Sequence, residues 1–270
     1  MDNRPIGIFD SGLGGLTAVN ALKSLLPTEN FVYVGDTARV PYGGKDVDTL
    51  RLYSDQIITF LQNEHNVKLI IVACGTISTN VMDYLQAKFS VPIIDVVQPG
   101  IAACLQFCER NNKHKVGVIA TTATVKSGFF QRALEKNLDL QILACPLFVP
   151  IIEAGLANTI ISAKIAEEYL YNWAKSAENP DLYNLIDVLI FGCTHYPLLN
   201  EQIQRILPNV HLIDMAQSAL LATNQYLSVH KMYSEKKLPS KFYVSGDVDK
   251  FNQQASKITG LEILAEKLHL

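Results

Sequence analysis

Residues Leu69–Thr76 read LIIVACGT, an apolar run that ends in a cysteine, a glycine and a threonine. A short apolar run bounded by small and polar residues is typical of a buried strand that leads into a loop. The same arrangement returns at Val188–His195, which reads VLIFGCTH. Ligand sites of open parallel sheets lie beyond the carboxyl ends of the strands. Cys74 and Cys193 are therefore both predicted where such folds place their chemistry.

Apolar runs alternate with amphipathic segments along the chain, and this alternation predicts an α/β fold with mainly parallel sheets covered on both faces. The clearest helix is predicted over Asp48–Gln62, where apolar residues recur at helical spacing. A second helix is predicted over Thr159–Ala177, with Asn158 as its cap. Strands are predicted at Ile6–Phe9, Phe31–Gly35, Lys68–Ala73, Pro92–Val96, Lys115–Ala120, Gln141–Ala144, Val188–Gly192, Val210–Ile213 and Lys241–Val244.

The two cysteine strands lie about one domain apart in the chain, which suggests two similar α/β units that face each other across an active-site cleft. We predict the first unit at 1–98 plus 213–270 and the second at 99–212. The chain would cross between them near Gln98–Pro99 and near His211–Asp214. The tail after Ile213 is expected to carry a helix, a strand and a helix and to return to the first unit.

Composition limits the class of protein. Of the 270 residues, 49% are hydrophobic and 18% are charged, which is ample apolar material for a globular core. A net charge of −3 without blocks of like charge argues against nucleic acid or an anionic membrane as a partner. Residues 1–15 lack the apolar core of a signal peptide, and no apolar run approaches the roughly 18 residues of a membrane span. We therefore expect a cytoplasmic protein.

The segment Phe9–Gly15, FDSGLGG, predicts a strand that runs into a glycine-rich turn before a helix near Leu16. Thr17 stands where a dinucleotide-binding fingerprint needs its third glycine, and no Walker A lysine follows, so neither nucleotide motif is present. The backbone N–H groups of the turn could still face a carboxylate. Asp10 could contact a substrate ammonium group or a cysteine, or could simply cap the turn.

A second polar loop, Gly35–Lys45, follows the next predicted strand and reads GDTARVPYGGK. Loops after strands often carry binding groups, and Tyr42 could reach a ligand from this one. Spacing alone favours a plain surface turn.

The five cysteines form an odd, irregularly spaced set, which argues against a disulfide framework. A helix that begins after Cys74 would point its first N–H groups at the thiol and favour the thiolate. Cys193 has the same placement, and His195 could polarise it or bind a substrate carboxylate. Glu153 follows an apolar run and could cap or face solvent. The remaining cysteines lack a Cys-x-x-Cys or histidine partner and are assigned to the core rather than to a metal site: Cys104, Cys108 and Cys145.

Taken together, these segments resemble the glutamate racemase branch of the aspartate/glutamate racemase family. The likeness follows one order along the chain, which makes it more specific than any single motif. It is carried by Gly7–Gly15, Gly35–Gly43, Val72–Cys74, Gly192–Leu198 and Val244–Asp247, with weaker matches at Ala120–Thr124 and Phe148–Glu153.

The resemblance implies two α/β domains with the active site between them. It implies interconversion of L- and D-glutamate without pyridoxal phosphate, metal or other cofactor, which supplies D-glutamate for peptidoglycan. Glutamate would be the small-molecule partner, with no nucleic acid or membrane partner, and a homodimer is one expected assembly.

The resemblance also assigns roles within the site. Cys74 would act as the base on the D-isomer and Cys193 as the base on the L-isomer, one thiol on each face of Cα. Acidic and imidazole groups would assist them: Asp10, Glu153 and His195. The substrate would be held by Asp10, Ser11, Tyr42, Gly43, Gly75, Thr76, Thr121, Thr194 and His195.

One position departs from the family pattern. Asparagine usually follows the first cysteine, whereas this chain has Gly75. A lost hydrogen bond to a charged group costs about 1.5–3 kcal/mol, which corresponds to a roughly 10- to 150-fold loss in rate or affinity. Two alternatives therefore stay open: an aspartate or broad-specificity racemase, and a glutamate-binding regulatory protein derived from a racemase.

Overall fold

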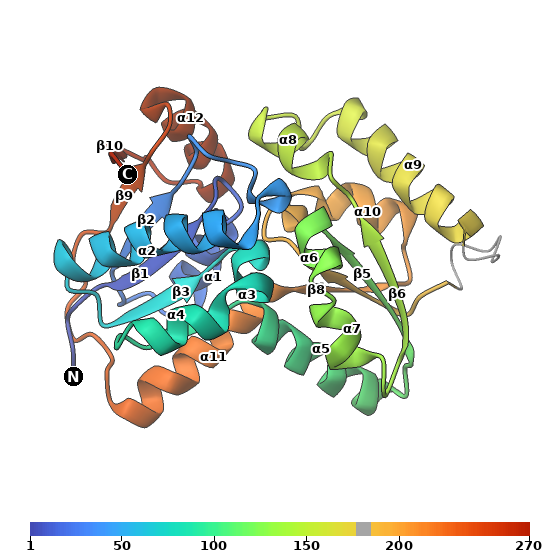
Figure 1. Cartoon of the computed structure of the whole chain (residues 1–270), viewed down its shortest axis with the longest axis horizontal. Helices are drawn as coiled ribbons and strands as arrows, with labels where there is room; N and C mark the ends of the chain where they lie inside the picture. Colours follow the sequence, from blue (N-terminus) through green and yellow to red (C-terminus); the bar gives the residue numbers. More distant parts are fainter. Residues whose placement is uncertain (177–184) are drawn as a thin grey trace.

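The computed structural model describes residues 1–176 and 185–270, and these residues form two lobes that lie side by side (Figure 1). Within them the strands build a six-stranded sheet, ordered β10-β9-β2-β1-β3-β4, and a four-stranded sheet, ordered β6-β5-β7-β8. The larger sheet contains β1 (Ile6–Asp10), β2 (Phe31–Gly35), β3 (Leu69–Val72), β4 (Ile93–Asp95), β9 (Lys241–Val244) and β10 (Glu266–Lys267). The smaller contains β5 (Lys115–Ala120), β6 (Asp139–Ala144), β7 (Val188–Phe191) and β8 (His211–Asp214).

Every strand pair in both sheets is parallel, and helices cover both faces, so the predicted α/β class is confirmed. The strands β2-β1-β3-β4 of the larger sheet and β6-β5-β7-β8 of the smaller one have the same topology. In each set, the second strand along the chain is followed across the sheet by the first, the third and the fourth. The tail adds β9 and β10 beyond β2. We call the larger sheet with its covering helices the first half, and the smaller sheet with its covering helices the second half.

Helices connect the strands within each half. The first half carries α1 (Leu16–Leu25), η1 (Tyr42–Gly44), α2 (Val47–Asn63), α3 (Gly75–Asn80), α4 (Met82–Lys88) and α12 (Val248–Thr259). The second carries α6 (Thr122–Lys126), α7 (Phe129–Leu134), α8 (Phe148–Glu153), α9 (Ile160–Ser176), η3 (Tyr196–Leu199) and α10 (Asn200–Ile206).

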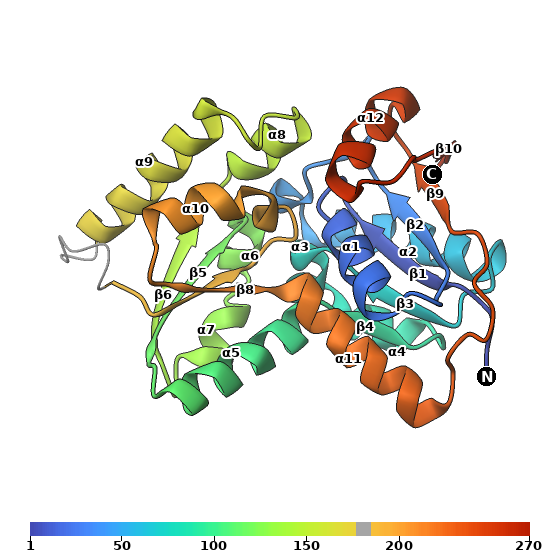
Figure 2. The same cartoon turned by 180° about the vertical axis from the view of Figure 1, so that it is seen from behind.

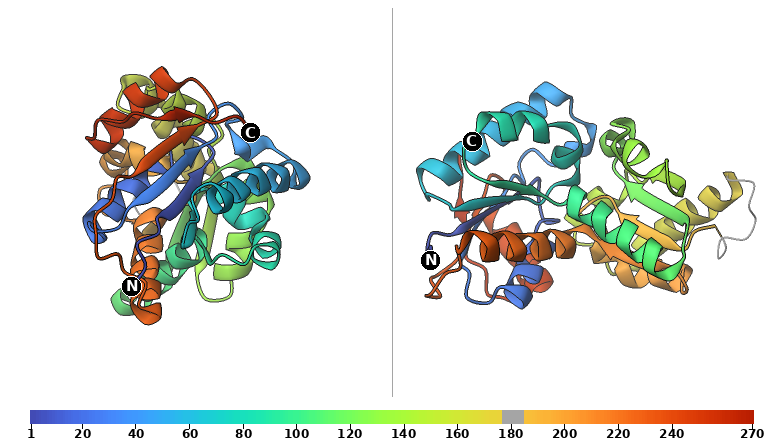
Figure 3. Two further views of the ribbon diagram at one scale, coloured as in Figure 1. Left: turned by 90° about the vertical axis from the view of Figure 1, so that its left-hand side faces the viewer. Right: turned by 90° about the horizontal axis from the view of Figure 1, so that it is seen from below.

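Two helices are exchanged between the halves. Helix α5 (Val97–Asn111) follows β4 of the first half but packs on β7 and β8 of the second, whereas α11 (Met215–His230) follows β8 and packs on α1 and β4 of the first. The two helices also contact each other, as the rear and lower views show (Figure 2 and Figure 3). The chain thus passes between the halves at α5 and at the start of α11, and the domain limits at 98/99 and 212/213 stay predictions.

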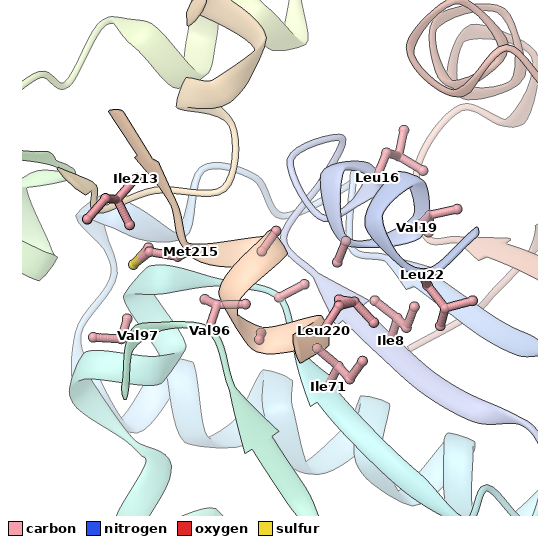
Figure 4. Packing of buried hydrophobic residues seen from close by; sticks show 14 of the residues in the cluster. Ile8, Leu16, Val19, Leu22, Ile71, Val96, Val97, Ile213, Met215 and Leu220 are labelled. Atoms are coloured by element: carbon pink, nitrogen blue, oxygen red, sulfur yellow. The ribbon is translucent and has the colours of Figure 1, made fainter. Parts of the chain in front are cut away.

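The exchanged helices complete one continuous hydrophobic cluster that contains residues of both halves. On the first half, this cluster contains Leu16, Val19 and Leu22 of α1, Leu220 of α11 and the strand residues Ile8 and Ile71 (Figure 4). Near the crossings the same cluster contains Val96, Val97, Ile213 and Met215. Burial of this apolar surface is the main force that holds the helices on the sheets.

All the predicted strands occur, and their ends differ from the predicted ones by two residues at most. The helix predicted over Asp48–Gln62 is α2, and that over Thr159–Ala177 is α9, although Ala177 lies outside the described residues. The predicted cap of α9 is wrong. The N–H of Ser162 donates to Thr159 Oγ1 at 3.5 Å, while Asn158 accepts from Gln202 at 3.2 Å, so the threonine next to the helix takes the role.

No helix within 1–176 or 185–270 combines the length and apolar character that a bilayer crossing requires.

A buried ion pair fixes the far end of the larger sheet. Lys68 Nζ lies 2.6 Å from Glu29 Oε2, and neither side chain is exposed. The same ammonium group donates to the carbonyl oxygens of Asp2 and Met232, at 2.8 and 2.7 Å, and Glu29 Oε1 accepts from the N–H of Ser234 at 2.7 Å. The pair therefore ties the start of the chain, β3 and the segment after α11 together.

Lys68→Met leaves the Glu29 carboxylate buried without its cation, so we expect the free energy of unfolding to fall by about 3–5 kcal/mol. Guanidinium denaturation measures this change. Adding Glu29→Gln should recover most of the loss, because no buried charge then lacks a partner. The control is Glu201→Gln, which breaks an exposed pair with Arg205 at 3.8 Å. If Lys68→Met unfolds no more readily than this control, the assigned role of the pair is wrong.

Candidate active site

One cavity lies where β1, β3, β5 and β7 end, between the two halves. The volume of this cavity is about 10 Å³, which is roughly enough for one water molecule. An amino acid needs far more space than this closed form leaves. Of the residues predicted for the site, all except Glu153 line this cavity: Asp10, Ser11, Tyr42, Gly43, Cys74, Gly75, Thr76, Thr121, Cys193, Thr194 and His195.

Cys193, His195 and Glu153 form a connected row on the second half. His195 Nδ1 lies 3.8 Å from Cys193 Sγ, and His195 Nε2 lies 2.6 Å from Glu153 Oε1. Burial lowers the pKa of His195, but its hydrogen bonds to Cys193 and Glu153 outweigh burial and hold the pKa well above the ordinary value of 6.5. The raised pKa means that the groups around His195 favour the protonated ring, and this ring lies beside Cys193 Sγ.

Cys74 lies in the opposite environment. It precedes α3 and is buried, and no charged nitrogen contacts its sulfur among the described residues. Burial raises the pKa of the Cys74 thiol, and the nearby carboxylate of Asp10 raises it further. The backbone N–H groups of Thr76 and Ile77 act in the other direction but do not compensate. The helix that follows Cys74 therefore favours the thiolate, as expected, but burial and the Asp10 carboxylate outweigh this effect and raise the pKa of the thiol.

Asp10 caps the turn after β1, which was one of the alternatives left by the sequence, and it also contacts Thr194 of the second half. Its Oδ2 accepts the N–H of Gly12 at 3.0 Å, which closes the turn after β1. Its Oδ1 accepts the hydroxyl of Thr194 of the second half at 3.3 Å. The carboxyl group is fully buried, and this burial raises its pKa. Asp10 therefore links the two halves directly beside the cavity.

The glycine-rich turn of the first half faces the catalytic candidates of the second. The N–H of Leu13 donates to Glu153 Oε1 at 2.7 Å, and the N–H of Gly14 lies 3.3 Å from His195 Nε2. A Cβ on Gly12 would overlap the Glu153 carboxylate, and one on Gly14 would overlap the His195 ring. The turn does present its amides to a carboxylate, but that carboxylate belongs to the protein.

Tyr42 and its loop close the other side of the cavity. Tyr42 is 1% exposed, so the alternative of a surface turn is wrong at this residue. Its hydroxyl donates to Asp36, which also accepts from Ser245 Oγ and Arg39 Nε, each at 2.5 Å. This carboxylate holds the ring in place from outside the cavity.

The threonines complete the contact between the halves. Thr76 Oγ1 and Thr121 Oγ1 lie 3.0 Å apart, and the backbone of Gly43 packs against the Thr121 side chain. These hydroxyls can donate to or accept from a carboxylate once the halves open.

Several residues of the site escaped the sequence analysis. Pro41 and Val149 line the cavity, Leu13 binds Glu153, and the hydroxyl of Tyr33 donates to the carbonyl of Gly12 at 2.5 Å. Tyr33 lies inside a strand pattern, where an aromatic residue carries no functional signal. The core assignment of the other cysteines is confirmed by their burial: Cys104, Cys108 and Cys145.

Comparisons with known proteins agree with this arrangement. The sequence model described as Asp/Glu/Hydantoin racemase matches residues 17–223. A glutamate racemase from Hydrogenobaculum sp. is 44% identical over 220 residues, which cover 81% of each chain.

Solved structures give the same result. The glutamate racemase from Francisella tularensis, solved in complex with D-glutamate, has a TM-score of 0.85 and 37% identity, covering 100% of this chain and 98% of its own. An aspartate racemase from Picrophilus torridus shares the fold alone, with a TM-score of 0.60 and 15% identity over 83% of this chain and 94% of its own. The chain belongs to the Asp/Glu/Hydantoin racemase family.

Proposed function

We propose that this protein is a glutamate racemase, an isomerase that interconverts L- and D-glutamate with two cysteines and no cofactor. The observation that carries the proposal is the placement of Cys74 and Cys193, from opposite halves, in one closed cavity. Relatives named glutamate racemase, 34% to 44% identical to this chain, support glutamate as the substrate. The product D-glutamate would serve peptidoglycan synthesis, as the resemblance implies.

Racemisation removes one proton from Cα and returns one to the opposite face. The thiolate of Cys193, beside the His195 imidazolium, would accept the Cα proton of the L-isomer. The electron pair left on Cα would then take the proton of the Cys74 thiol from the other face, which leaves Cys74 as thiolate and Cys193 as thiol. The D-isomer would run the same steps in reverse. The raised pKa of the Cys74 thiol fits its role as the acid in the first direction.

The α-carboxylate would gain negative charge as the Cα proton leaves. Hydrogen-bond donors fixed around that charge stabilise it most effectively when water is excluded. We propose that the hydroxyls of Thr76, Thr121 and Thr194 provide such donors from both halves. Asp10 would bind the substrate ammonium group, since its buried carboxylate adjoins the cavity.

Two other functions are weaker candidates. An aspartate or broad-specificity racemase would keep both thiols, and Gly75 is the feature that favours it. A glutamate-binding regulatory protein would have no need for the row of Cys193, His195 and Glu153. Circular dichroism of L- and D-glutamate incubated with the purified protein, without added cofactor, separates these functions when L- and D-aspartate are tested alongside.

We expect Cys74→Ser and Cys193→Ser each to lose racemisation by a factor of at least about 10², because each removes one of the two acid–base groups. In D₂O, Cys74→Ser should still exchange the Cα hydrogen of L-glutamate without inversion, and Cys193→Ser that of D-glutamate. Mass spectrometry with chiral chromatography measures both. Cys108→Ala, a core cysteine outside the site, is the control. Near-normal racemisation by either serine variant contradicts the two-thiol scheme.

Glu153→Gln should lower the pKa of His195, because it removes the anion 2.6 Å from Nε2. A raised pKa stabilises the native state fully below the ordinary value of 6.5, and this contribution is lost as the pH rises through the raised value. The difference in unfolding free energy between wild type and variant should therefore be largest below pH 6.5 and shrink at alkaline pH. Denaturation across pH, with imidazole titration by NMR, measures both effects. A pH-independent difference or an unchanged His195 pKa would show that Glu153 has no such influence.

A further inference from the structure

At Gly75, next to Cys74, the two halves meet through main chain alone. Gly75 begins α3 and faces the carbonyl oxygen of Gly192, which follows β7. A Cβ added at Gly75 would lie 2.6 Å from this oxygen, well inside the 3.4 Å at which ordinary van der Waals contact begins. The two backbones approach this closely only because position 75 carries no side chain.

Neither side of this contact can yield by a simple rotation. The N–H of Gly192 donates to the carbonyl of Ile119 at 2.8 Å, and a Cβ at Gly192 would itself lie 2.9 Å from that oxygen and from Ala120 Cβ. Gly192 is therefore fixed against β5. On the opposite side, the N–H of Ser78 donates to the carbonyl of Cys74 at 2.9 Å, so Gly75 is held in the first turn of α3. A side chain at position 75 would have to move whole segments.

The same contact limits the space around both thiols. On this side of the cavity the halves also meet at Thr76 and Thr121. On the other side they meet where Glu153 accepts from Leu13. Since contacts on both sides leave room for roughly one water molecule, a small retreat at Gly75 changes the cavity markedly.

We propose that Gly75 is a positioning residue that sets how far the two halves close over Cys74 and Cys193. This proposal rests on the proposed racemase function, for which full closure brings both thiols to Cα and excludes water. A side chain at position 75 stops the halves at a wider separation. The asparagine expected from the family pattern would put its Cβ into the contact with Gly192, so this chain replaces a side-chain amide with direct contact between two backbones.

The test compares Gly75→Ala with Gly44→Ala. Both glycines lie beside the site, but a Cβ at Gly44 meets nothing within 4 Å, which makes it the matched control. The rate at which iodoacetamide alkylates each cysteine is measured on the free full-length protein by peptide mass spectrometry. In Gly75→Ala, the two site cysteines should react about 5- to 150-fold faster, the factor that corresponds to the usual cost of an inserted methyl group. Gly44→Ala should react like wild type.

The core cysteines report whether a variant opens or unfolds. The proposal is supported if the ratio of the alkylation rate of the site cysteines to that of the core cysteines rises in Gly75→Ala. An unchanged ratio overturns it, whether all five cysteines react faster or none does. The core set is Cys104, Cys108 and Cys145.

Kinetics provide the second measurement. Because closure follows binding, Gly75→Ala should lower kcat for glutamate by a larger factor than it raises KM, and Gly44→Ala should change neither. A rise in KM at unchanged kcat overturns the proposal. If wild-type protein does not interconvert L- and D-glutamate, the proposed function fails, and the alkylation ratio still decides whether Gly75 controls closure.

Discussion

The close approach of the two halves at glycine residues is the constraint on which the site depends. At four points the first half meets the second where a Cβ would collide with the opposing atoms: Gly12, Gly14, Gly43 and Gly75. The opposing atoms are the Glu153 carboxylate, the His195 ring, the Thr121 side chain and the Gly192 carbonyl. Because these glycines carry no side chain, polar groups of the two halves reach hydrogen-bond distance.

The two thiols have different chemical surroundings in this closed arrangement. Cys193 has an imidazole neighbour whose charge is stabilised by Glu153, whereas Cys74 has apolar surroundings and the carboxylate of Asp10 nearby. Two cysteines in a topologically repeated position therefore have unlike neighbours, which suits the opposite protonation states that we propose for them. The repeated strand order places both cysteines at the cavity, and their different neighbours distinguish the two thiols.

The fold class, the strand positions and the gathering of site residues could be predicted, because parallel strands bring Asp10, Cys74, Thr121 and Cys193 to common edges. What could not be predicted depends on burial and on side-chain contacts that exist only in the folded protein. Burial and the Asp10 carboxylate raise the pKa of the Cys74 thiol, and the buried Tyr42 binds Asp36, which also accepts from Ser245 Oγ. Local patterns carry no information on either. The roles assigned to the site residues stay predictions.

The exchange of α5 and α11 has a consequence for how the molecule folds. Each helix leaves one sheet and covers the other, and a single hydrophobic cluster runs through both halves. A fragment that held only one half would leave part of a sheet face uncovered and a helix without its partner, and the exposed apolar surface would lower its stability. The two sheets are separate, but we expect them to unfold together as one cooperative unit. The halves share a strand order without being independently folding domains.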